Sequence, residues 1–348
     1  MRVSHYFEWG ETITGGFAQS VRNQRTILDR RGIDYTTEPT LDADLLHLNN
    51  MGPRSLYYAR RARHTGVPVL AHTHNTAEDF RESFVLSNLL AVPLRPYLAH
   101  AYGQADHLVC PSPHNREVIA SYTDTPSTVV SNGFDPARIE GYDDPDLRER
   151  YLDRHDLEPP VVFMLGHVIQ RKGLATFVET ARAMPDLDFA WFGYLSPTGG
   201  TVDRFLQPRE TRRLVEESPD NCTFTGYVED PRGAFAAGDV FLWPSKNENE
   251  GMALLEAMAC GKPPVIRAIP TYDWLEDGVT CLKVPGETAA DATAGGDEAV
   301  DGFVAAIERL LADEALRERI GDNAAAKSAE FTLESVGDDL VALYERLV

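Results

Sequence analysis

The chain has 348 residues, of which 43% are apolar and 25% charged, and its formal net charge at pH 7 is −21. This length predicts two domains with separate hydrophobic cores, and the composition excludes a disordered or fibrous protein. Because the chain is strongly acidic and nearly all its basic residues are arginines, its composition resembles that of proteins from a high-salt cytoplasm.

The negative charge is concentrated in the later part of the chain. Residues 1–140 contain 13 basic and 15 acidic side chains, whereas residues 141–348 contain 20 and 39. Because phosphate binding requires positive charge, this distribution argues against nucleic acid as a partner. The nearly neutral first part is able to approach an anionic surface.

The sequence lacks the patterns of membrane-spanning and exported chains. No apolar run approaches the roughly 18 residues of a transmembrane helix, and residues 1–10 lack the apolar region of a signal peptide. The four cysteines are widely spaced without a CxxC pair, which predicts neither a zinc site nor a disulfide framework. We therefore expect a cytoplasmic protein, with peripheral contact to the cytoplasmic membrane face as an extension of that expectation.

In the first 140 residues, strand and helix patterns alternate. A strand is predicted at Val3–Phe7, and a glycine-bearing loop, 12–16, leads into a helix at 17–30. The further predicted strands are 45–48, 67–72, 107–110 and 128–130, and the further predicted helices are 54–64, 79–102 and 113–121. We expect the helix at 79–102 to be interrupted at Pro93 and Pro96. This alternation predicts parallel βαβ units.

The polar segment 141–160, which contains three prolines, predicts a linker. A second α/β series follows, with predicted strands at 161–165, 189–192, 222–225, 240–243 and 264–266 and helices from 300 onward. The fold class is therefore predicted as two doubly wound Rossmann-like α/β domains, 1–140 and 161–330, facing each other across a cleft. The helix at 331–348 is expected to pack back toward the first domain.

An acidic loop lies in the second series. Apolar residues at helical spacing from Gly251 onward predict a helix, so Glu248 lies on the preceding loop and Glu256 on the helix. Unpaired amides at a helix start can donate to an anion or to sugar hydroxyls. Two carboxylates at this spacing can bind a hydroxyl-rich ligand at two points. Glutamates near a helix start also act as caps, so both interpretations stay open.

A basic loop follows the first strand of the same series. The segment Gly166–Gly173 contains adjacent cations, Arg171 and Lys172, just before a predicted helix. Glycines, two cations and a helix start suit a diphosphate. An exposed basic pair on an ordinary loop is the alternative.

Together these motifs resemble the retaining glycosyltransferases of family 4, which have the two-domain GT-B fold. The resemblance implies that domain 1–140 binds an acceptor and domain 161–330 a nucleotide-sugar donor. The implied donor contacts are Lys172 and Arg171 on the diphosphate, Glu248 with the Gly251–Met252 backbone on the sugar, Glu256 on the ribose, and Gly16 near the phosphates. His74 is implied beside the reacting carbon, where it positions the sugar. The sequence departs from the family at His167, where many members have arginine.

A narrower resemblance is to the diacylglycerol glucosyltransferases, carried by His72–Phe84, Gln170–Gly173, Trp191–Gly193 and Ile269–Leu275. It implies a peripheral membrane enzyme whose amino-terminal domain faces the lipid. The expected membrane-contact residues are Arg54, Tyr57, Tyr58, Arg60, Arg61 and Arg63. A basic helix with aromatic residues can rest on an anionic bilayer, and an ordinary solvated helix is the alternative.

The function expected from these resemblances is transfer of a hexose, with retention, from a nucleotide sugar to an acceptor hydroxyl. UDP-hexose is the favoured donor and GDP-mannose the second, and the acceptor is expected to be a diacylglycerol-like or archaeol-like membrane lipid. The absence of a DxD-type pair after a strand predicts no metal, and no cofactor is expected. The alternatives are a polyprenyl-linked or soluble glycan acceptor, a nucleotide-sugar 2-epimerase, and a binding subunit without catalysis.

Overall fold

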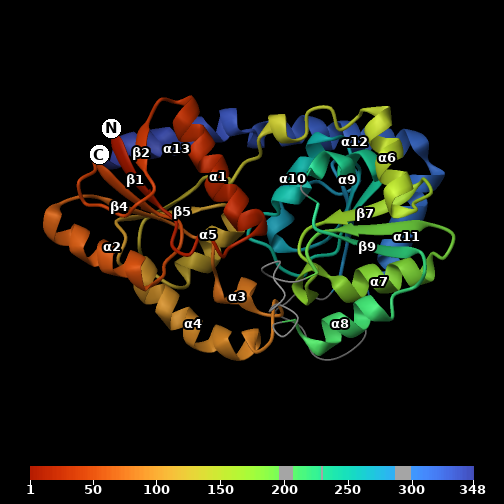
Figure 1. Cartoon of the computed structure of the whole chain (residues 1–348), viewed down its shortest axis with the longest axis horizontal. Helices are drawn as coiled ribbons and strands as arrows, with labels where there is room; N and C mark the ends of the chain where they lie inside the picture. Colours follow the sequence, from red (N-terminus) through yellow and green to blue (C-terminus); the bar gives the residue numbers. More distant parts are fainter. Residues whose placement is uncertain (196–206, 229, 287–298) are drawn as a thin grey trace. The chain divides into compact units, whose positions relative to one another are not determined.

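The computed structural model describes residues 1–195, 207–228, 230–286 and 299–348. The chain forms two compact units (Figure 1). Unit 1 consists of residues 1–80, 86–134 and 330–348, and unit 2 of residues 81–85 and 135–329. The described part of each unit contains a six-stranded parallel sheet. The prediction of two Rossmann-like α/β domains is thereby confirmed.

In unit 1 the strand order is β2-β1-β3-β4-β5-β6, and every pairing is parallel. The strands are β1 (Arg2–Tyr6), β2 (Asp34–Thr36), β3 (Leu45–Leu48), β4 (Val69–His72), β5 (His107–Cys110) and β6 (Ser127–Val129). The helices are α1 (Gly15–Arg30), α2 (Pro53–Thr65), α3 (Ala77–Phe80), α4 (Ser87–Tyr102), α5 (Pro113–Ala120) and α13 (Leu333–Leu347).

The two faces of this sheet bury separate apolar cores because successive strand residues point to opposite faces. On one face, Leu46 and Leu48 pack with Leu98 and Tyr102 of α4. On the other face, Val3, Leu45 and Leu70 pack with residues of α1 and α13. The helix α13, which contains Leu340 and Tyr344, therefore completes the core of unit 1.

In unit 2 the strand order is β12-β11-β10-β7-β8-β9, again with parallel pairs. The strands are β7 (Val161–Leu165), β8 (Asp188–Phe192), β9 (Cys222–Gly226), β10 (Val240–Trp243), β11 (Pro264–Arg267) and β12 (Leu282–Val284). The helices are α6 (Pro145–His155), α7 (Leu174–Ala183), α8 (Arg209–Glu216), α9 (Pro231–Ala237), α10 (Met252–Ala259), α11 (Val300–Ala312) and α12 (Glu314–Ser328). Single 3-10 turns lie at 136–138, 170–172, 270–272 and 329–331.

The segment 141–160, expected as a linker, is mostly helical and belongs to unit 2. Helix α6 is capped by Asp144, whose carboxylate accepts a hydrogen bond from the Asp146 amide. Leu147 and Tyr151, one helical turn apart, are buried. The sequence interpretation was wrong here because the many charges of α6 conceal this narrow apolar stripe.

The expected interruption at Pro93 and Pro96 was also wrong, because α4 runs through both prolines. The break comes earlier, at residues 81–86, where Glu82 and Leu86 have left-handed backbone conformations. Both prolines lie on the exposed side of α4, so water can reach the carbonyl groups that lose their amide partners.

Candidate active site

Two loops of unit 2 meet at the carboxyl edge of its sheet. Strands β7 and β10 are parallel neighbours, so the loops that follow them, 166–173 and 244–251, begin at the same edge. Gly173 has a φ of 80°, and a Cβ atom there would lie 2.3 Å from the Pro244 carbonyl oxygen. The close approach of the two loops therefore requires glycine at this position.

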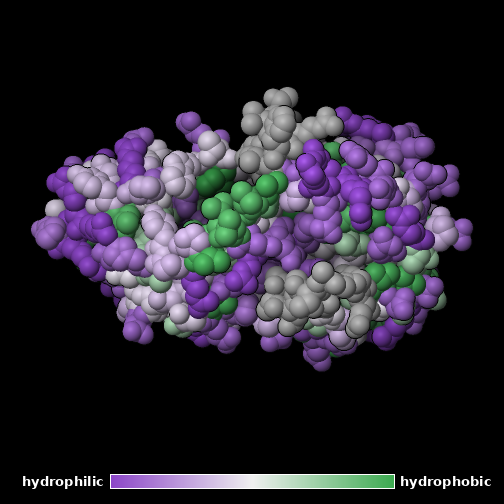
Figure 2. All heavy atoms as spheres, turned by 90° about the horizontal axis from the view of Figure 1, so that it is seen from below, coloured by the Kyte–Doolittle hydropathy of each residue, from purple (hydrophilic) through white to green (hydrophobic). Residues whose placement is uncertain are grey.

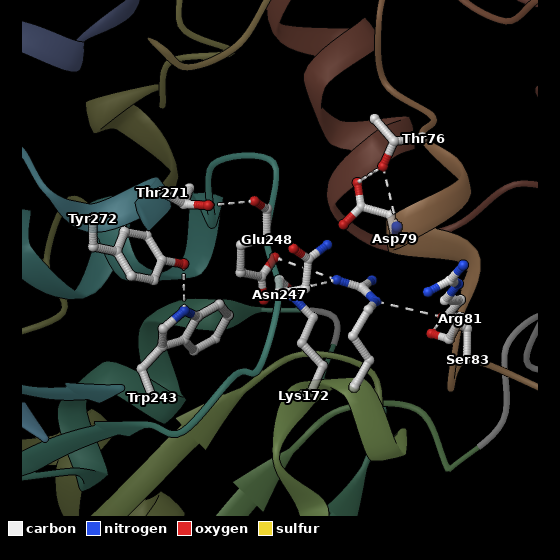
Figure 3. A network of polar contacts seen from close by, with 11 residues as sticks. Thr76, Asp79, Arg81, Ser83, Lys172, Trp243, Asn247, Glu248, Thr271 and Tyr272 are labelled. Atoms are coloured by element: carbon white, nitrogen blue, oxygen red, sulfur yellow. Dashed lines mark hydrogen bonds and ion pairs between the residues drawn. The ribbon is translucent and has the colours of Figure 1, made fainter. Parts of the chain in front are cut away.

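The predicted cations and the predicted carboxylate are in contact across these loops (Figure 3). The Lys172 Nζ donates to Glu248 Oε1 at 2.5 Å. The Arg171 Nη1 donates to the Asn247 carbonyl at 2.8 Å and lies 3.8 Å from Glu248 Oε2. All three charged side chains are at most 14% exposed. Each charge therefore has an opposite charge beside it, which offsets the cost of removing it from water.

Aromatic residues form the floor beneath Lys172. Its Nζ lies 4.6 Å from the centre of the Trp243 ring, a cation–π contact. The Trp243 Nε1 donates to the Tyr272 hydroxyl at 2.6 Å (Figure 3). Thr271 Oγ1 donates to the Glu248 carbonyl at 2.7 Å. The Trp243 ring therefore positions the Lys172 side chain, and Thr271 positions the backbone of Glu248.

Helix α10 begins immediately after the acidic loop. Gly251 precedes its first residue, Met252, and has a φ of 92°. A Cβ atom at Gly251 would lie 2.5 Å from the Tyr272 hydroxyl. Glycine is therefore required both by the backbone conformation and by the neighbouring ring. The backbone expected beside the sugar is in this way held next to the loop that carries Glu248.

Glu256 lies one turn into α10 and forms a different ion pair. It is buried, and its Oε1 accepts from Arg138 Nε at 3.2 Å. Burial raises the pKa of this carboxyl, and the neighbouring guanidinium opposes that rise. Arg138 was missed by the sequence reasoning because it precedes Glu256 by more than a hundred residues and belongs to no motif.

His167 lies on the basic loop and contributes no positive charge near neutral pH. Its ring stacks on Tyr194, with the ring centres 5.9 Å apart. Burial, and then the charges of Lys172 and Arg171, lower the pKa of His167 to about 4. The basic loop therefore contributes two cations, Arg171 and Lys172.

The two predicted site residues of unit 1 lie on separate elements of that unit. Gly16 is exposed in the first turn of α1, directly after Gly15, whose φ is 71°. His74 follows β4, and its ring stacks on Phe17 of α1 with centres 4.4 Å apart. Its Nε2 lies 3.2 Å from the Asn49 side-chain oxygen. Burial and the neighbouring histidines hold the pKa of His74 well below its usual value.

A buried row of histidines lies behind His74, and the sequence reasoning missed it. His72 stacks on His74 with centres 4.0 Å apart, and His47 and His5 continue the row through strands β3 and β1. Burial lowers the pKa of His5 to about 4 and that of His72 to about 3, and it also lowers the pKa of His47. The available signal was a histidine in each of three predicted strands.

Two polar side chains tie this row to helices. The Gln24 side chain of α1 contacts His5 Nε2 at 2.9 Å and His72 Nδ1 at 3.1 Å. The Tyr344 hydroxyl of α13 contacts His47 Nδ1 at 2.6 Å. These contacts fix neutral imidazoles inside the sheet of unit 1.

The residues expected to contact a membrane lie on α2 of unit 1. The four arginines and Tyr57 are exposed, and Tyr58 is half-buried. Arg54 pairs with Glu38, whereas Arg61 donates to the Tyr57 hydroxyl. Within the described ranges no group of three or more His, Cys, Asp or Glu side chains is placed to hold a metal ion. That the enzyme needs no metal remains a prediction.

The architecture of two parallel-sheet units defines the fold class of the chain. The structure resembles that of Anabaena HepE in complex with UDP-glucose, with a TM-score of 0.75, 17% identity and complete coverage of both chains. Two parallel-sheet units of this kind are the GT-B fold.

Sequence comparison gives the family. Residues 159–313 match "Glycosyl transferases group 1", and residues 14–138 match "Glycosyltransferase Family 4". The processive diacylglycerol alpha-glucosyltransferase of Acholeplasma laidlawii is 34% identical over 75% of this chain and 76% of the relative. The alpha-galactosylglucosyldiacylglycerol synthase of Streptococcus pneumoniae is 25% identical over 97% and 86%. The chain therefore belongs to glycosyltransferase family 4 and is a hexosyltransferase.

Proposed function

We propose that this enzyme transfers a hexose from a nucleotide sugar, UDP-glucose first among the donors, to a hydroxyl of a membrane lipid with retention of configuration. The contact between Lys172 and Glu248 is the observation that carries the proposal. In a nucleotide sugar the diphosphate is bonded directly to the reacting sugar carbon. A site for this donor therefore needs a cation for the phosphate directly beside a carboxylate for the sugar hydroxyls. Lys172 and Glu248 are such neighbours.

Donor binding on this proposal replaces the ion pair by contacts to the ligand. Lys172 and Arg171 turn from Glu248 and Asn247 to the diphosphate, and Glu248 becomes free to accept hydrogen bonds from sugar hydroxyls. Glu256 accepts from the ribose, and the charge of Arg138 favours the ionised form of this carboxyl. Because both sets of groups are already paired and buried, little desolvation remains to be overcome when the ligand arrives.

The chemical step follows a front-face path. The bond between the sugar carbon and the leaving phosphate oxygen breaks, and the acceptor oxygen bonds to the same face of that carbon. The acceptor proton passes to the leaving phosphate. Lys172 and Arg171 stabilise the charge that develops on that phosphate, by electrostatics arranged before the reaction begins.

His74 has the role of positioning the transferred sugar. Its pKa lies well below the usual range, so the imidazole is neutral at pH 7 and a weak base. A neutral imidazole can form a hydrogen bond to a sugar hydroxyl without competing for the acceptor proton. Gly16, at the start of α1, offers a backbone amide without a side chain in the way.

The lipid acceptor is supported by the relatives. The Acholeplasma protein, 34% identical to this chain, is named a processive diacylglycerol alpha-glucosyltransferase, and the Streptococcus protein is named an alpha-galactosylglucosyldiacylglycerol synthase. The Anabaena structure that shares the fold contains UDP-glucose. The arginines and tyrosines of α2 remain the expected contact with an anionic membrane in this proposal.

The test is incorporation of label from UDP-glucose, and in parallel from GDP-mannose, into extracted membrane lipids at high salt. The native enzyme is compared with Glu248→Ala, Lys172→Ala and Lys246→Ala. Lys246 lies on the same loop as Glu248 and is the matched control. Label in an organic-soluble glycolipid that is lost in the first two variants only, with the donor anomer retained by NMR, supports the proposal.

Two results would overturn it. Consumption of the nucleotide sugar without any acceptor would indicate the epimerase. Binding of the nucleotide sugar with no turnover of either donor, on lipid, polyprenyl-linked or soluble acceptors, would indicate a binding subunit. Transfer only to a soluble glycan would move the acceptor to that class while leaving the donor site intact. Activity in excess EDTA tests the expected metal independence.

A further inference from the structure

Helix α4 has an apolar stripe that faces solvent. Leu86, Leu89, Leu90 and Pro93 recur at the spacing of one helix face, and all are exposed. Leu89 is 67% exposed and Leu86 is 63% exposed. Val92, beside the stripe, is also 67% exposed. In a water-soluble domain such a stripe normally packs on a core.

The opposite face of α4 already fulfils that role. Leu98 and Tyr102 are buried in the core of unit 1, and the Tyr102 hydroxyl donates to the Asn75 carbonyl. The helix is therefore apolar on both sides, and only one side is covered. Figure 2 shows apolar side chains gathered in one patch on the lower face of the molecule, and α4 lies on that side in Figure 1. A contiguous apolar patch of this kind marks an interaction surface.

The charges around the stripe indicate what covers it. In a chain with 54 acidic residues, the runs 45–77 and 83–105 contain none. These runs include the whole of α2 and α4. The helices lie side by side, since Arg60 donates to His100 Nε2 at 2.6 Å and Arg63 donates to the Gly103 carbonyl at 2.8 Å.

The arginines of this surface differ in their partners. Arg95 pairs with Glu78 beside the base of α4, and Arg54 pairs with Glu38. Arg60, Arg61 and Arg63 contact no carboxylate among the residues that the structure describes. Two helices without acidic residues, which combine these arginines with exposed leucines, form a surface complementary to an anionic lipid surface. A protein partner for it would need acidic groups on an apolar face.

We propose that the stripe Leu86, Leu89, Leu90 and Pro93, together with Val92 beside it, inserts into the acyl boundary of an anionic lipid bilayer, with the α2 arginines on the lipid headgroups. On this proposal α4 makes the apolar contact that anchors the protein to the membrane, and the arginines of α2 make the electrostatic contact with it. The inference deepens the proposed function by naming the membrane-binding surface, although lipid binding through α4 does not require that function to be correct. No helix within the described ranges is long and apolar enough to cross a bilayer.

The experiment measures vesicle binding by co-sedimentation, with equal parts of phosphatidylglycerol and phosphatidylcholine, at low and at high salt. The double variant Leu89→Ser, Val92→Ser changes two side chains that are each 67% exposed, so we expect its folding to be little affected. Val348→Ser, a residue 60% exposed on unit 1 outside α4, is the matched control. We expect at least a tenfold loss of vesicle affinity in the double variant at both salt concentrations, and no loss in the control.

The electrostatic part has its own variant. Arg60→Gln with Arg61→Gln is expected to weaken binding severalfold at low salt and little at high salt, because salt screens exposed charges. In addition, Leu90→Trp is expected to show blue-shifted fluorescence on vesicles, quenched by brominated acyl chains. Wild-type affinity retained by the double serine variant, or an unquenched tryptophan, would overturn the insertion of α4.

A second copy of the chain is the other occupant to exclude. Light scattering that shows a dimer dissociated by Leu89→Ser, Val92→Ser, without vesicle binding by the wild type, would replace the lipid by a self-interface. Transfer to a detergent-dispersed acceptor is measured on the same samples. If the wild type transfers no sugar but binds vesicles through α4, the proposed function fails and this inference stands. If the wild type transfers sugar but its vesicle binding is unchanged by the α4 substitutions, the proposed function stands and the insertion of α4 fails.

Discussion

In unit 1 the strands β1, β3 and β4 carry His5, His47 and His72 into the interior, whereas in unit 2 the strands β7 and β10 lead into loops with Lys172 and Glu248. The histidines of unit 1 are neutral and are held by side-chain hydrogen bonds and ring stacking. Lys172 and Glu248 of unit 2 are charged and form an ion pair. The same parallel scaffold accepts both because its backbone hydrogen bonds are satisfied within the sheet, which leaves the side chains at its edge free to differ.

The two arrangements avoid the cost of buried charge in different ways. The histidines of unit 1 lose their charge, as their lowered pKa values indicate. The groups of unit 2 keep their charges beside opposite ones. A neutral array is sensitive to pH, and a paired array is sensitive to loss of one partner. The predictions below test this difference.

The largest effect expected is acid destabilisation of unit 1. Unfolded histidines bind protons near pH 6.5, but folded His5 and His72 do so only near pH 4 and 3. As the pH falls below 6.5, the unfolded state therefore gains protons that the folded state cannot bind, and stability falls. Between pH 7 and 5 the loss is about 2 kcal/mol for each of the two histidines. Native-state hydrogen exchange of amides in β1, β3 and β4 measures it.

The variant His5→Gln is the control, since it removes one of these groups and should reduce the pH dependence accordingly. The opening free energy of strand amides in unit 2 should fall less with falling pH, because that unit has two histidines with lowered pKa values, His155 and His167, and no row of four buried histidines. Equal opening free energies at pH 7 and pH 5 in unit 1 would contradict the neutral array.

The next effect is on catalysis in unit 2. Lys172→Met should lower kcat/KM for the donor by about 10²–10³-fold, because it removes one of the two cations arranged for the leaving phosphate. It also leaves Glu248 with the more distant Arg171 as its cation, so the free energy of unfolding should fall by about 3 kcal/mol.

A second substitution separates the two readouts. Lys172→Met with Glu248→Gln removes both charges, so stability should return toward that of the wild type while activity stays low. Lys246→Met should change kcat/KM by less than about twofold, since Glu248 forms its ion pairs with Lys172 and Arg171, and Lys246 has no contact with the phosphate in the proposed function. Recovery of activity in the double variant would show that the pair serves stability alone.

A smaller effect distinguishes loop contact from backbone strain. Gly173 and Gly226 have φ values of 80° and 76°, but only at Gly173 would a Cβ atom meet another backbone group. Gly226→Ala should cost about 1 kcal/mol of unfolding free energy for its left-handed backbone. Gly173→Ala should cost at least twice that, because the Pro244 carbonyl cannot move aside without moving β10. Equal losses in urea titrations would mean that the two loops are not held together here.

The smallest effect concerns an exposed ion pair of unit 1. Arg31, at the end of α1, lies 3.0 Å from Glu334 and 2.8 Å from Asp338 of α13, and both carboxylates are mostly exposed. Arg31→Gln should cost less than about 1 kcal/mol. A loss near that of Lys172→Met, in the same urea titrations, would remove the distinction between exposed and buried pairs.

Much of the scaffold could be predicted from the sequence because its strands are short apolar runs bounded by turns. The strands at 45–48, 107–110, 161–165 and 240–243 are confirmed residue for residue. The edge strands β2 and β12 were missed, since each has three residues and carries polar side chains. Helix α6 was missed because most of its residues are charged and only Leu147 and Tyr151 mark its buried side.

The site could be predicted only as far as its motifs reach. Lys172 and Glu248 were found through loops that follow strands, and the structure brings them together. Trp243, Tyr272 and Arg138 were not found, because their contacts join residues far apart in the chain and leave no local spacing. The histidine row depends on strand order, which no single strand reveals. The roles assigned to His74, Gly16 and Glu256 stay predictions.

Unit 1 is interrupted in sequence, since the segment 330–348 returns to it after the whole of unit 2. Leu340 and Tyr344 of α13 pack on the face of its sheet that also contacts α1, and the Leu333 amide donates a hydrogen bond to the Phe134 carbonyl. During synthesis on the ribosome, unit 1 therefore has one apolar face that α1 covers only in part until the whole of unit 2 has been made. We expect unit 1 to complete its core after unit 2 has been synthesised, and chaperone binding to concentrate on the nascent chain before α13 emerges.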